Sequence, residues 1–175
     1  MNLQMDGRKA DNYSSNAQKI RVITEDWVNN NMFCPYCGNK YVSHFENNRP
    51  VADFFCPSCK EEYELKSKSA SISNKINDGA YNTMIERITS INNPNFFLLC
   101  TIIKLVYRLK IFVMVPKYFF SPDIIEKRKP LAETARRAGW TGCNILLNRI
   151  PNEGRIYIVQ NEKEISVKKD NGKGA

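Results

Sequence analysis

The sequence has no long uninterrupted run of apolar residues. Its most apolar stretch, residues 96–115, is interrupted by Lys104, Arg108 and Lys110. A membrane-spanning helix needs about 18 or more apolar residues in succession, so this stretch is no candidate for one. Residues 1–16 are polar and lack the apolar segment of a secretory signal peptide. We therefore expect a cytoplasmic protein that spans no membrane.

Internal repeats are also absent, and the composition excludes wholesale disorder. Of the 175 residues, 42% are hydrophobic and 25% are charged, which is typical of one globular domain. The net charge is +8, from 26 Lys and Arg against 18 Asp and Glu. A basic protein favours a polyanionic partner, because each neutralised phosphate releases condensed counterions. Charge alone does not establish that this partner is a nucleic acid.

The pattern of apolar residues predicts an α/β domain with one central sheet. We expect a loose polar lead-in over residues 1–16, a folded domain over residues 17–160 and a polar tail over residues 161–175. Ser14 or Ser15 is expected to cap the first helix, which ends near the run of asparagines at 29–31. The other expected elements are strands at 50–55, 62–66, 96–103, 109–115 and 155–160, a loop at 67–77, a helix at 78–91 and an irregular region at 117–150.

Four of the six cysteines form two Cys-x-x-Cys pairs. Cys34 and Cys37 are separated from Cys56 and Cys59 by 18 residues. In a chain without an export signal, such pairs are typical of metal ligands and not of disulfides. Four thiolates complete a tetrahedral zinc site and leave no position for water, so the predicted zinc (residues 34–59) is structural. The single histidine, His44, is not needed as a ligand.

Two carboxylates and a lysine flank the second cysteine pair. Glu64 and Lys66 are two residues apart in a predicted strand, so they share a face from which Leu65 points away. We interpret Asp53 and Glu64 as magnesium ligands, with the backbone carbonyl of Leu65 as a third oxygen. Lys66 would position the water that attacks a phosphodiester. The alternative is an ion-paired sheet face without catalytic function, because this short pattern also arises by chance.

Longer blocks resemble the catalytic domain of methyl-directed restriction endonucleases of the DpnI type, which belong to the PD-(D/E)XK nuclease superfamily. The similarity extends over roughly residues 14–160. The matching blocks are residues 21–28 (RVITEDWV), 47–54 (NNRPVADF), 61–67 (EEYELKS), 77–81 (NDGAY), 92–97 (NNPNFF) and 129–145 (KPLAETARRAGWTGCNI).

The resemblance implies a mixed central sheet flanked by helices, with a four-cysteine zinc site inserted. It also implies magnesium-dependent cleavage of duplex DNA at GATC sites whose adenine is methylated, with no obligate protein partner. Asp53, Glu64 and Lys66 match the family's catalytic motif, and the four paired cysteines match its zinc ligands. Glu25, on the first helix, lies where many nucleases of the superfamily carry an auxiliary acid. An ordinary glutamate on the helix surface is the alternative.

Basic and aromatic side chains outside this motif are candidates for reading DNA. Arg136 and Arg137 have the chemistry to contact phosphates or the edges of guanine, and Lys68 and Lys75 are further basic candidates. Trp140, between two nearby glycines, is a candidate reader of the adenine methyl group. The alternative for Trp140 is a core residue between two turns.

Enzymes of this type carry a winged-helix domain after the nuclease domain, which adds a second DNA contact. Here the sequence ends at Ala175, about where that domain would begin. We therefore expect weaker DNA affinity, because fewer phosphates are neutralised. Three functions stay open: a methyl-dependent endonuclease, a methylated-DNA-binding module with weak or no cleavage, and a zinc-ribbon interaction protein.

Overall fold

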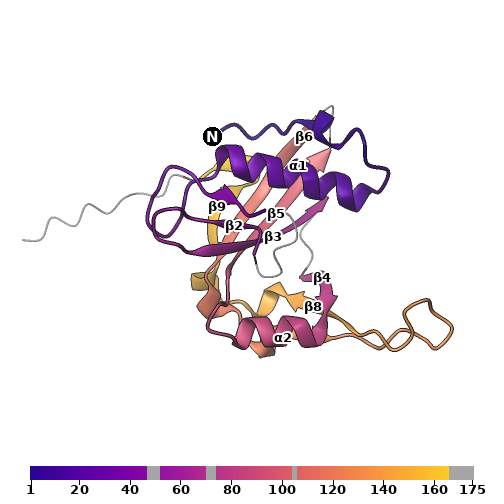
Figure 1. The fold of residues 1–175 in the computed structure, drawn as a ribbon. Coiled ribbons are helices and arrows are strands. Elements are labelled where there is room, and N and C mark those ends of the chain that lie inside the picture. Colours follow the sequence, from indigo (N-terminus) through magenta and orange to yellow (C-terminus); the bar gives the residue numbers. More distant parts are fainter. Residues whose placement is uncertain (47–51, 70–73, 104–105, 166–175) are drawn as a thin grey trace, which may run out of the picture.

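Two sheets and two α-helices make up the fold of the computed structural model, which describes residues 1–46, 52–69, 74–103 and 106–165 (Figure 1). The larger sheet has the strand order β1-β2-β3-β5-β6-β9-β10, and the smaller has the order β4-β8-β7. The strands are β1 (Ser43–His44), β2 (Phe54–Phe55), β3 (Glu62–Ser69), β4 (Lys75–Ala80), β5 (Asn95–Ile103), β6 (Tyr107–Val115), β7 (Ile125–Lys127), β8 (Gly142–Leu146), β9 (Ile156–Gln160) and β10 (Lys163–Glu164). The helices are α1 (Asn16–Asn31) and α2 (Tyr81–Thr89), and short 3-10 turns lie at Gly7–Ala10, Lys117–Phe119, Pro122–Ile124, Leu147–Arg149 and Asn152–Gly154.

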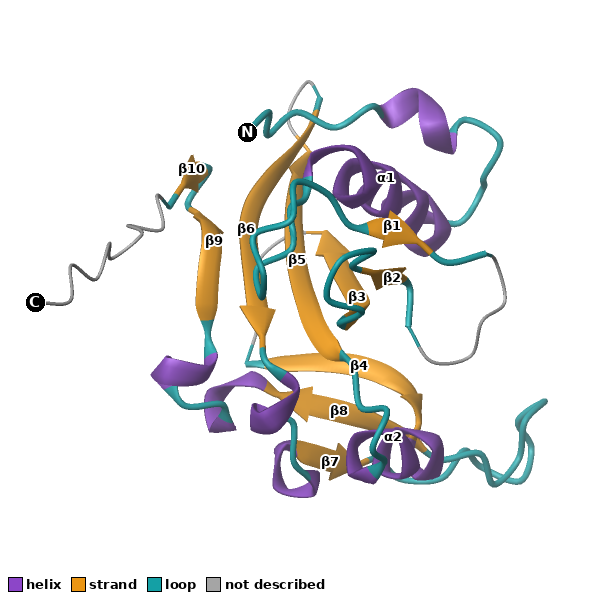
Figure 2. Cartoon of the chain, turned by 60° about the vertical axis from the view of Figure 1, so that its left-hand side comes forward, coloured by secondary structure: helices purple, strands orange, loops and turns teal. Residues whose placement is uncertain are grey.

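The larger sheet is mixed, as the resemblance implies. β3 and β5 run parallel, whereas β5–β6 and β6–β9 are antiparallel. The prediction of central strands at 96–103 and 109–115 is confirmed, because β5 and β6 lie in the middle of this sheet. Figure 2 shows the smaller sheet and α2 gathered at one end of these strands.

Alternate residues of β5 and β6 point to two different cores. Phe97 and Leu99 pack in one cluster with α1, whereas Phe96 and Leu98 pack in the other with α2 and the smaller sheet. A strand that is covered on both faces reads as a continuous apolar run, which is why β5 is so evident in the sequence. The larger sheet therefore separates the core on the α1 side from the core on the α2 side.

The first helix occupies the predicted position and ends at Asn31. Ser15 is its N-cap residue, but the Ser15 side chain makes no capping hydrogen bond. The polar lead-in is not loose as expected. Its backbone pairs with β6, where Leu3 accepts a hydrogen bond from the Leu109 amide at 2.9 Å, and Met5 is buried. Neither helix in the described ranges is long and apolar enough to cross a membrane.

Three predicted segments differ from the structure. The predicted loop at 67–77 is wrong at both ends, because β3 continues to Ser69 and β4 begins at Lys75. The second helix begins at Tyr81 and not at 78, since residues 78–80 complete β4. The region 117–150, expected to be irregular, contains β7 and β8. Positions 50–51 of the predicted strand 50–55, positions 70–73 of the loop and positions 166–175 of the tail lie outside the described residues.

These errors share a physical cause. β4 is a polar strand in which only alternate residues such as Ile76 are partly covered, so its sequence resembles that of a loop. Its conformation is decided by pairing with β8, which lies more than 60 positions further along the chain. Strand propensity depends on such neighbours, and no local pattern reveals them.

Candidate active site and metal site

The four paired cysteines come together at one point. Their sulfurs all lie within 4.8 Å of one another, and the Cys34–Cys59 and Cys37–Cys56 sulfur pairs are each separated by 3.6 Å. Zinc–sulfur bonds of about 2.3 Å in a tetrahedron place the sulfurs roughly 3.8 Å apart. The spacing therefore fits a four-thiolate zinc site.

The two cysteine turns have the same backbone geometry. The Gly38 amide bonds to the Cys34 carbonyl at 2.9 Å, and the Lys60 amide bonds to the Cys56 carbonyl at 3.0 Å. Gly38 and Lys60 both have positive φ, at 76° and 66°. Gly38 suits this conformation because it has no Cβ to strain. The two turns thus present their sulfurs in equivalent ways, as paired zinc knuckles do.

The surroundings of the sulfurs require a cation if all four are to be thiolates. Burial raises the pKa of the Cys59 thiol to about 12, whereas the Asn39 backbone N–H lowers the pKa of Cys37 to about 7. The Tyr63 hydroxyl lies 3.0 Å from the Cys34 sulfur on the buried side of the cluster, whereas Cys37 is exposed. A divalent ion would stabilise the charged form of all four ligands at once.

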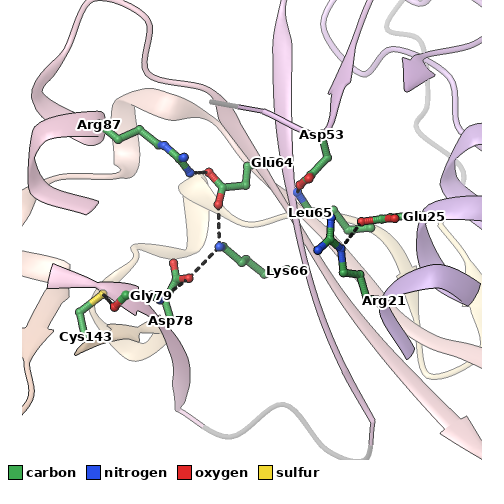
Figure 3. Close-up of polar contacts among 10 residues, drawn as sticks. All are labelled: Arg21, Glu25, Asp53, Glu64, Leu65, Lys66, Asp78, Gly79, Arg87 and Cys143. Atoms are coloured by element: carbon green, nitrogen blue, oxygen red, sulfur yellow. Dashed lines mark hydrogen bonds and ion pairs between the residues drawn. The ribbon is translucent and has the colours of Figure 1, made fainter. Parts of the chain in front are cut away.

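A second group of polar side chains lies on the α2 side of β3. Glu64 and Lys66 project from the same face, as predicted, and the Lys66 Nζ lies 2.6 Å from Glu64 Oε1 (Figure 3). Asp78 of β4 and Arg87 of α2 join them. Lys66 Nζ donates to Asp78 Oδ1 at 2.7 Å, and Arg87 donates to Glu64 Oε2. Charges therefore alternate along a chain from Arg87 through Glu64 and Lys66 to Asp78.

These four side chains line a cleft of about 170 Å³, together with residues at the start of α2. The carboxylates of Glu64 and Asp78 decide the charge of Lys66. Burial opposes the charged form of Lys66, but the two carboxylates outweigh it and raise the pKa of Lys66. Lys66 is therefore an ammonium group held in a small, acid-lined space.

Asp53 is the residue just before β2, and its side chain contacts β3. Its Oδ2 accepts a hydrogen bond from the Leu65 amide at 2.7 Å, so Asp53 bonds to the strand edge and not to Glu64 or Lys66. The N–H and C=O of one strand residue point to the same side. The Leu65 carbonyl therefore faces the edge at which Asp53 lies, past the point where β2 pairing ends at Tyr63.

Glu25 lies on the α1 side of β3, apart from the cleft. It accepts a hydrogen bond from Arg21 Nε at 2.6 Å, and its other oxygen lies 3.9 Å from His44 Nε2. Glu25 raises the pKa of Arg21, chiefly through this hydrogen bond, and Asp53 adds a weaker electrostatic contribution. Glu25 is thus linked to Asp53 through the charge of Arg21.

Two of the basic residues expected to read DNA, Arg136 and Arg137, lie on a projecting arm. Residues 128–141 leave the body between β7 and β8 (Figures 1 and 2), and Leu131 and Trp140 pair across the arm at 2.9 Å. Arg136 and Arg137 are exposed on it. The Arg137 guanidinium carbon lies 4.3 Å from the centre of the Trp140 ring.

Trp140 lies at the base of this arm and is half-buried. A Cβ at Gly142 would approach its ring within 2.8 Å, so only glycine allows the ring to lie so close to β8. Among the described residues, Trp140 belongs to neither hydrophobic core. The ring packs on β8 outside both clusters, and its assignment as a methyl reader stays a prediction.

The two lysine candidates lie elsewhere. Lys68 is exposed near the end of β3, and Lys75, at the start of β4, pairs with Glu126 at 2.8 Å. The structure does not bring them together with the arm. Neither lysine lines the cleft.

Sequence reasoning missed Asp78 and Arg87. Asp78 lies in the block NDGAY at 77–81, so a polar residue within a family-like block was the available signal. Arg87 had no such signal, because a basic residue on an amphipathic helix is ordinary. Only the approach of β4 and α2 to β3 makes these two residues part of the cleft.

A family model described as "DpnI: Dam-replacing family" matches residues 1–171. The match includes both cysteine turns, the cleft residues and the arm, and it confirms the resemblance to DpnI-type methyl-directed restriction endonucleases. Such nucleases act on DNA, so DNA is the partner that the family implies. Since the match extends over nearly the whole sequence, the chain belongs to the DpnI, or Dam-replacing, family.

Proposed function

We propose that this chain is a magnesium-dependent, type II endonuclease of the PD-(D/E)XK kind. It cleaves duplex DNA at GATC sites whose adenine is methylated. The observation that carries the proposal is the arrangement around β3. Glu64 and Lys66 project together into a cleft, and Asp53 meets the edge of the same strand beside Leu65.

The residues around this edge offer the oxygen ligands that magnesium prefers. Asp53 and Glu64 would supply carboxylates, and Leu65 would supply its backbone carbonyl. The Leu65 amide fixes Asp53 through Oδ2. Asp53 Oδ1 would then be the oxygen directed at the ion. When bound, the metal polarises the scissile phosphate and stabilises the negative charge that develops on it.

Lys66 would act on the water that attacks the phosphodiester. Its ammonium group is held beside Glu64 in the cleft, where it would orient the attacking water and stabilise the hydroxide that forms. Arg87 faces the same cleft, and a phosphate entering there would compete with Glu64 for its guanidinium. Glu25 would act indirectly in this scheme, by holding Arg21 near Asp53.

The arm would provide recognition. Arg136 and Arg137 are exposed cations that would bind the DNA backbone or guanine edges, with Lys68 and Lys75 as further phosphate contacts. Trp140 offers a flat aromatic surface at the base of the arm. A methyl group on the adenine amine adds an apolar contact in the major groove, and we assign its recognition to this ring.

One observation favours a second candidate function. Glu64 is already paired with both Lys66 and Arg87, as it would be in an ion-paired face without catalytic function. The alternative is therefore a methylated-DNA-binding module that does not cleave. A zinc-ribbon interaction protein is disfavoured by the family match, which extends far beyond the cysteine turns.

One experiment separates these functions. The protein is incubated with magnesium and with two preparations of one plasmid, methylated or unmethylated at the adenine of GATC. Cleavage of methylated plasmid alone is the expected result. Binding of methylated plasmid without cleavage would favour the binding module. Cleavage of both preparations would contradict methyl dependence. The absence of both binding and cleavage would contradict the whole proposal.

A further inference from the structure

Asp78 reaches the cleft from the smaller sheet. It lies on β4 and faces Lys66 of β3, so their ion pair at 2.7 Å joins the two sheets at the cleft. Its side chain is 11% exposed and that of Lys66 is 20% exposed. The pair is therefore shielded from water on most sides, and its geometry is better defined than that of a surface pair.

Lys66 lies between two carboxylates that differ in their other partners. Glu64 also binds Arg87, and in the proposed function it binds the metal. Asp78 instead bonds to the Gly79 amide, at 2.7 Å, through the same oxygen that receives Lys66. If Glu64 binds the metal, Asp78 is the carboxylate that would keep Lys66 in place.

The backbone at Asp78 is built to fix this carboxylate. The pairing of β4 with β8 shifts register between Asp78 and Ala80, so Gly79 forms a bulge. The Cys143 thiol donates to the Gly79 carbonyl at 3.5 Å, and the Tyr81 amide bonds to Thr141 at 3.0 Å. A bulge re-aims the neighbouring side chain, and here that side chain is Asp78.

The second oxygen of Asp78 supports a role beyond folding. Within the described residues, Oδ2 is buried and has no hydrogen-bond partner. Both contacts of Asp78 are instead made through Oδ1, to Lys66 in the cleft and to the adjacent Gly79 amide. The position is better explained by the demands of the cleft.

We infer that Asp78 is a positioning residue of the active site, which holds the Lys66 ammonium group at the point where the attacking water is oriented. This inference rests on the proposed function. Asp78 would touch neither the metal nor the phosphate, and would act only through Lys66.

The test compares Asp78→Asn with a matched control, Glu61→Gln, in the full chain. Glu61 also forms a part-buried pair with a lysine, at 3.0 Å from Lys117, but it does not line the cleft. We expect Asp78→Asn to slow single-turnover cleavage of methylated DNA by roughly 10–100-fold, because a displaced catalytic group loses its alignment. The Kd for the same DNA without metal should stay unchanged, and Glu61→Gln should cleave at the wild-type rate.

A measurement without metal or DNA gives an independent readout. An ammonium group held in an ion pair exchanges its protons slowly enough to give a ¹H–¹⁵N signal. The Lys66 signal, identified by its loss in Lys66→Met, should shift and broaden in Asp78→Asn, because only Glu64 then pairs with Lys66, and should be unchanged in Glu61→Gln. Calcium affinity, measured by calorimetry in place of magnesium, should be unchanged by Asp78→Asn.

The outcomes distinguish this inference from the proposed function. Wild-type protein that fails to cleave methylated DNA would overturn the proposed function. Wild-type cleavage with an equally fast Asp78→Asn would overturn the inference alone, as would a Lys66 signal that Asp78→Asn leaves unchanged. Weaker calcium binding by Asp78→Asn would also overturn it, because Asp78 would then be a metal ligand. Equal slowing by Glu61→Gln would reduce the effect to general destabilisation.

Discussion

Among the described residues, the carboxylate of Asp53 is held by a hydrogen bond from the Leu65 amide to Oδ2. An asparagine has nearly the same shape, and its side-chain oxygen can accept that bond as well. The charge of Asp53 can therefore be removed with little disturbance of β2 and β3. This separates its proposed function as a metal ligand from its contribution to the fold.

We predict that Asp53→Asn lowers the rate of cleavage of methylated plasmid by about 10³-fold or more, because a bound metal contributes several kcal/mol to the transition state. Zinc content should stay at the wild-type level, as measured by atomic absorption. Asp123→Asn, an exposed acid on a 3-10 turn, is the control and should cleave normally. Normal cleavage by Asp53→Asn would exclude this residue as a ligand.

The Trp140 ring lies between the side chain of Arg137 and the backbone of β8. Arg137 stacks over its ring at 4.3 Å, and Gly142 allows the ring to pack against β8. The ring is therefore held in one orientation although it lies outside both cores. A fixed aromatic plane is what the detection of a single methyl group requires.

Replacing Trp140 by alanine should reduce the ratio of cleavage rates on methylated and unmethylated GATC by about tenfold or more, since one methyl group is worth about 1–3 kcal/mol. Rates on the two substrates are measured side by side. Tyr118→Ala, which removes an aromatic ring that is 80% exposed elsewhere, should leave the ratio unchanged. A Trp140→Ala variant with full discrimination would show that the methyl group is read elsewhere.

At the scale of elements, the two cysteine turns join segments that pack in the core on the α1 side of the larger sheet. The first follows α1, and the second lies between β2 and β3. Cys34 and Cys56 are both part of the core on the α1 side. A metal at this point would fix α1 and β3 relative to each other, and so would hold the strand that carries Glu64 and Lys66.

We predict that Cys34→Ala loses bound zinc and destabilises the fold by several kcal/mol, because the free energy of metal binding contributes directly to folding. Zinc per chain and urea unfolding report the two effects. Cys100→Ala removes an equally buried thiol from β5 and should keep its zinc. Full zinc content in Cys34→Ala would contradict the four-cysteine site.

For the whole molecule, the distribution of charge matters more than its sum. The net charge of +8 includes Arg136 and Arg137 on the projecting arm, whereas the cleft holds acids and bases in near balance. Arg136 and Arg137 are therefore our candidates for DNA contacts away from the cleft. Its contribution should appear in the salt dependence of binding.

The double substitution Arg136→Gln/Arg137→Gln should weaken binding to methylated duplex DNA. It should also reduce the slope of log K against log salt by about 1 to 2, since roughly one counterion is released per phosphate contact. Fluorescence anisotropy over a salt series measures both. Arg8→Gln/Lys163→Gln removes the same charge from other exposed positions and should leave the slope unchanged. An unchanged slope in the arm variant would exclude phosphate contacts there.

The sequence by itself determined the features that depend on residue type and short spacing. Paired cysteines predicted the four-cysteine cluster, and continuous apolar runs predicted β5 and β6, because burial on both faces leaves a local signal. Alternation along β3 placed Glu64 and Lys66 on one face, as period-two geometry requires. Long blocks of similarity predicted the family, which the match over residues 1–171 confirms.

Only the tertiary structure decided what lies opposite those residues. β4 is polar and becomes a strand by pairing with β8, and that pairing brings Asp78 to Lys66. Arg87 reaches Glu64 because α2 packs beside the same cleft. Such contacts join residues 12 to 64 positions apart, as in Lys66–Asp78 and Gly79–Cys143. Their energies depend on distances that the order of residues along the chain does not specify.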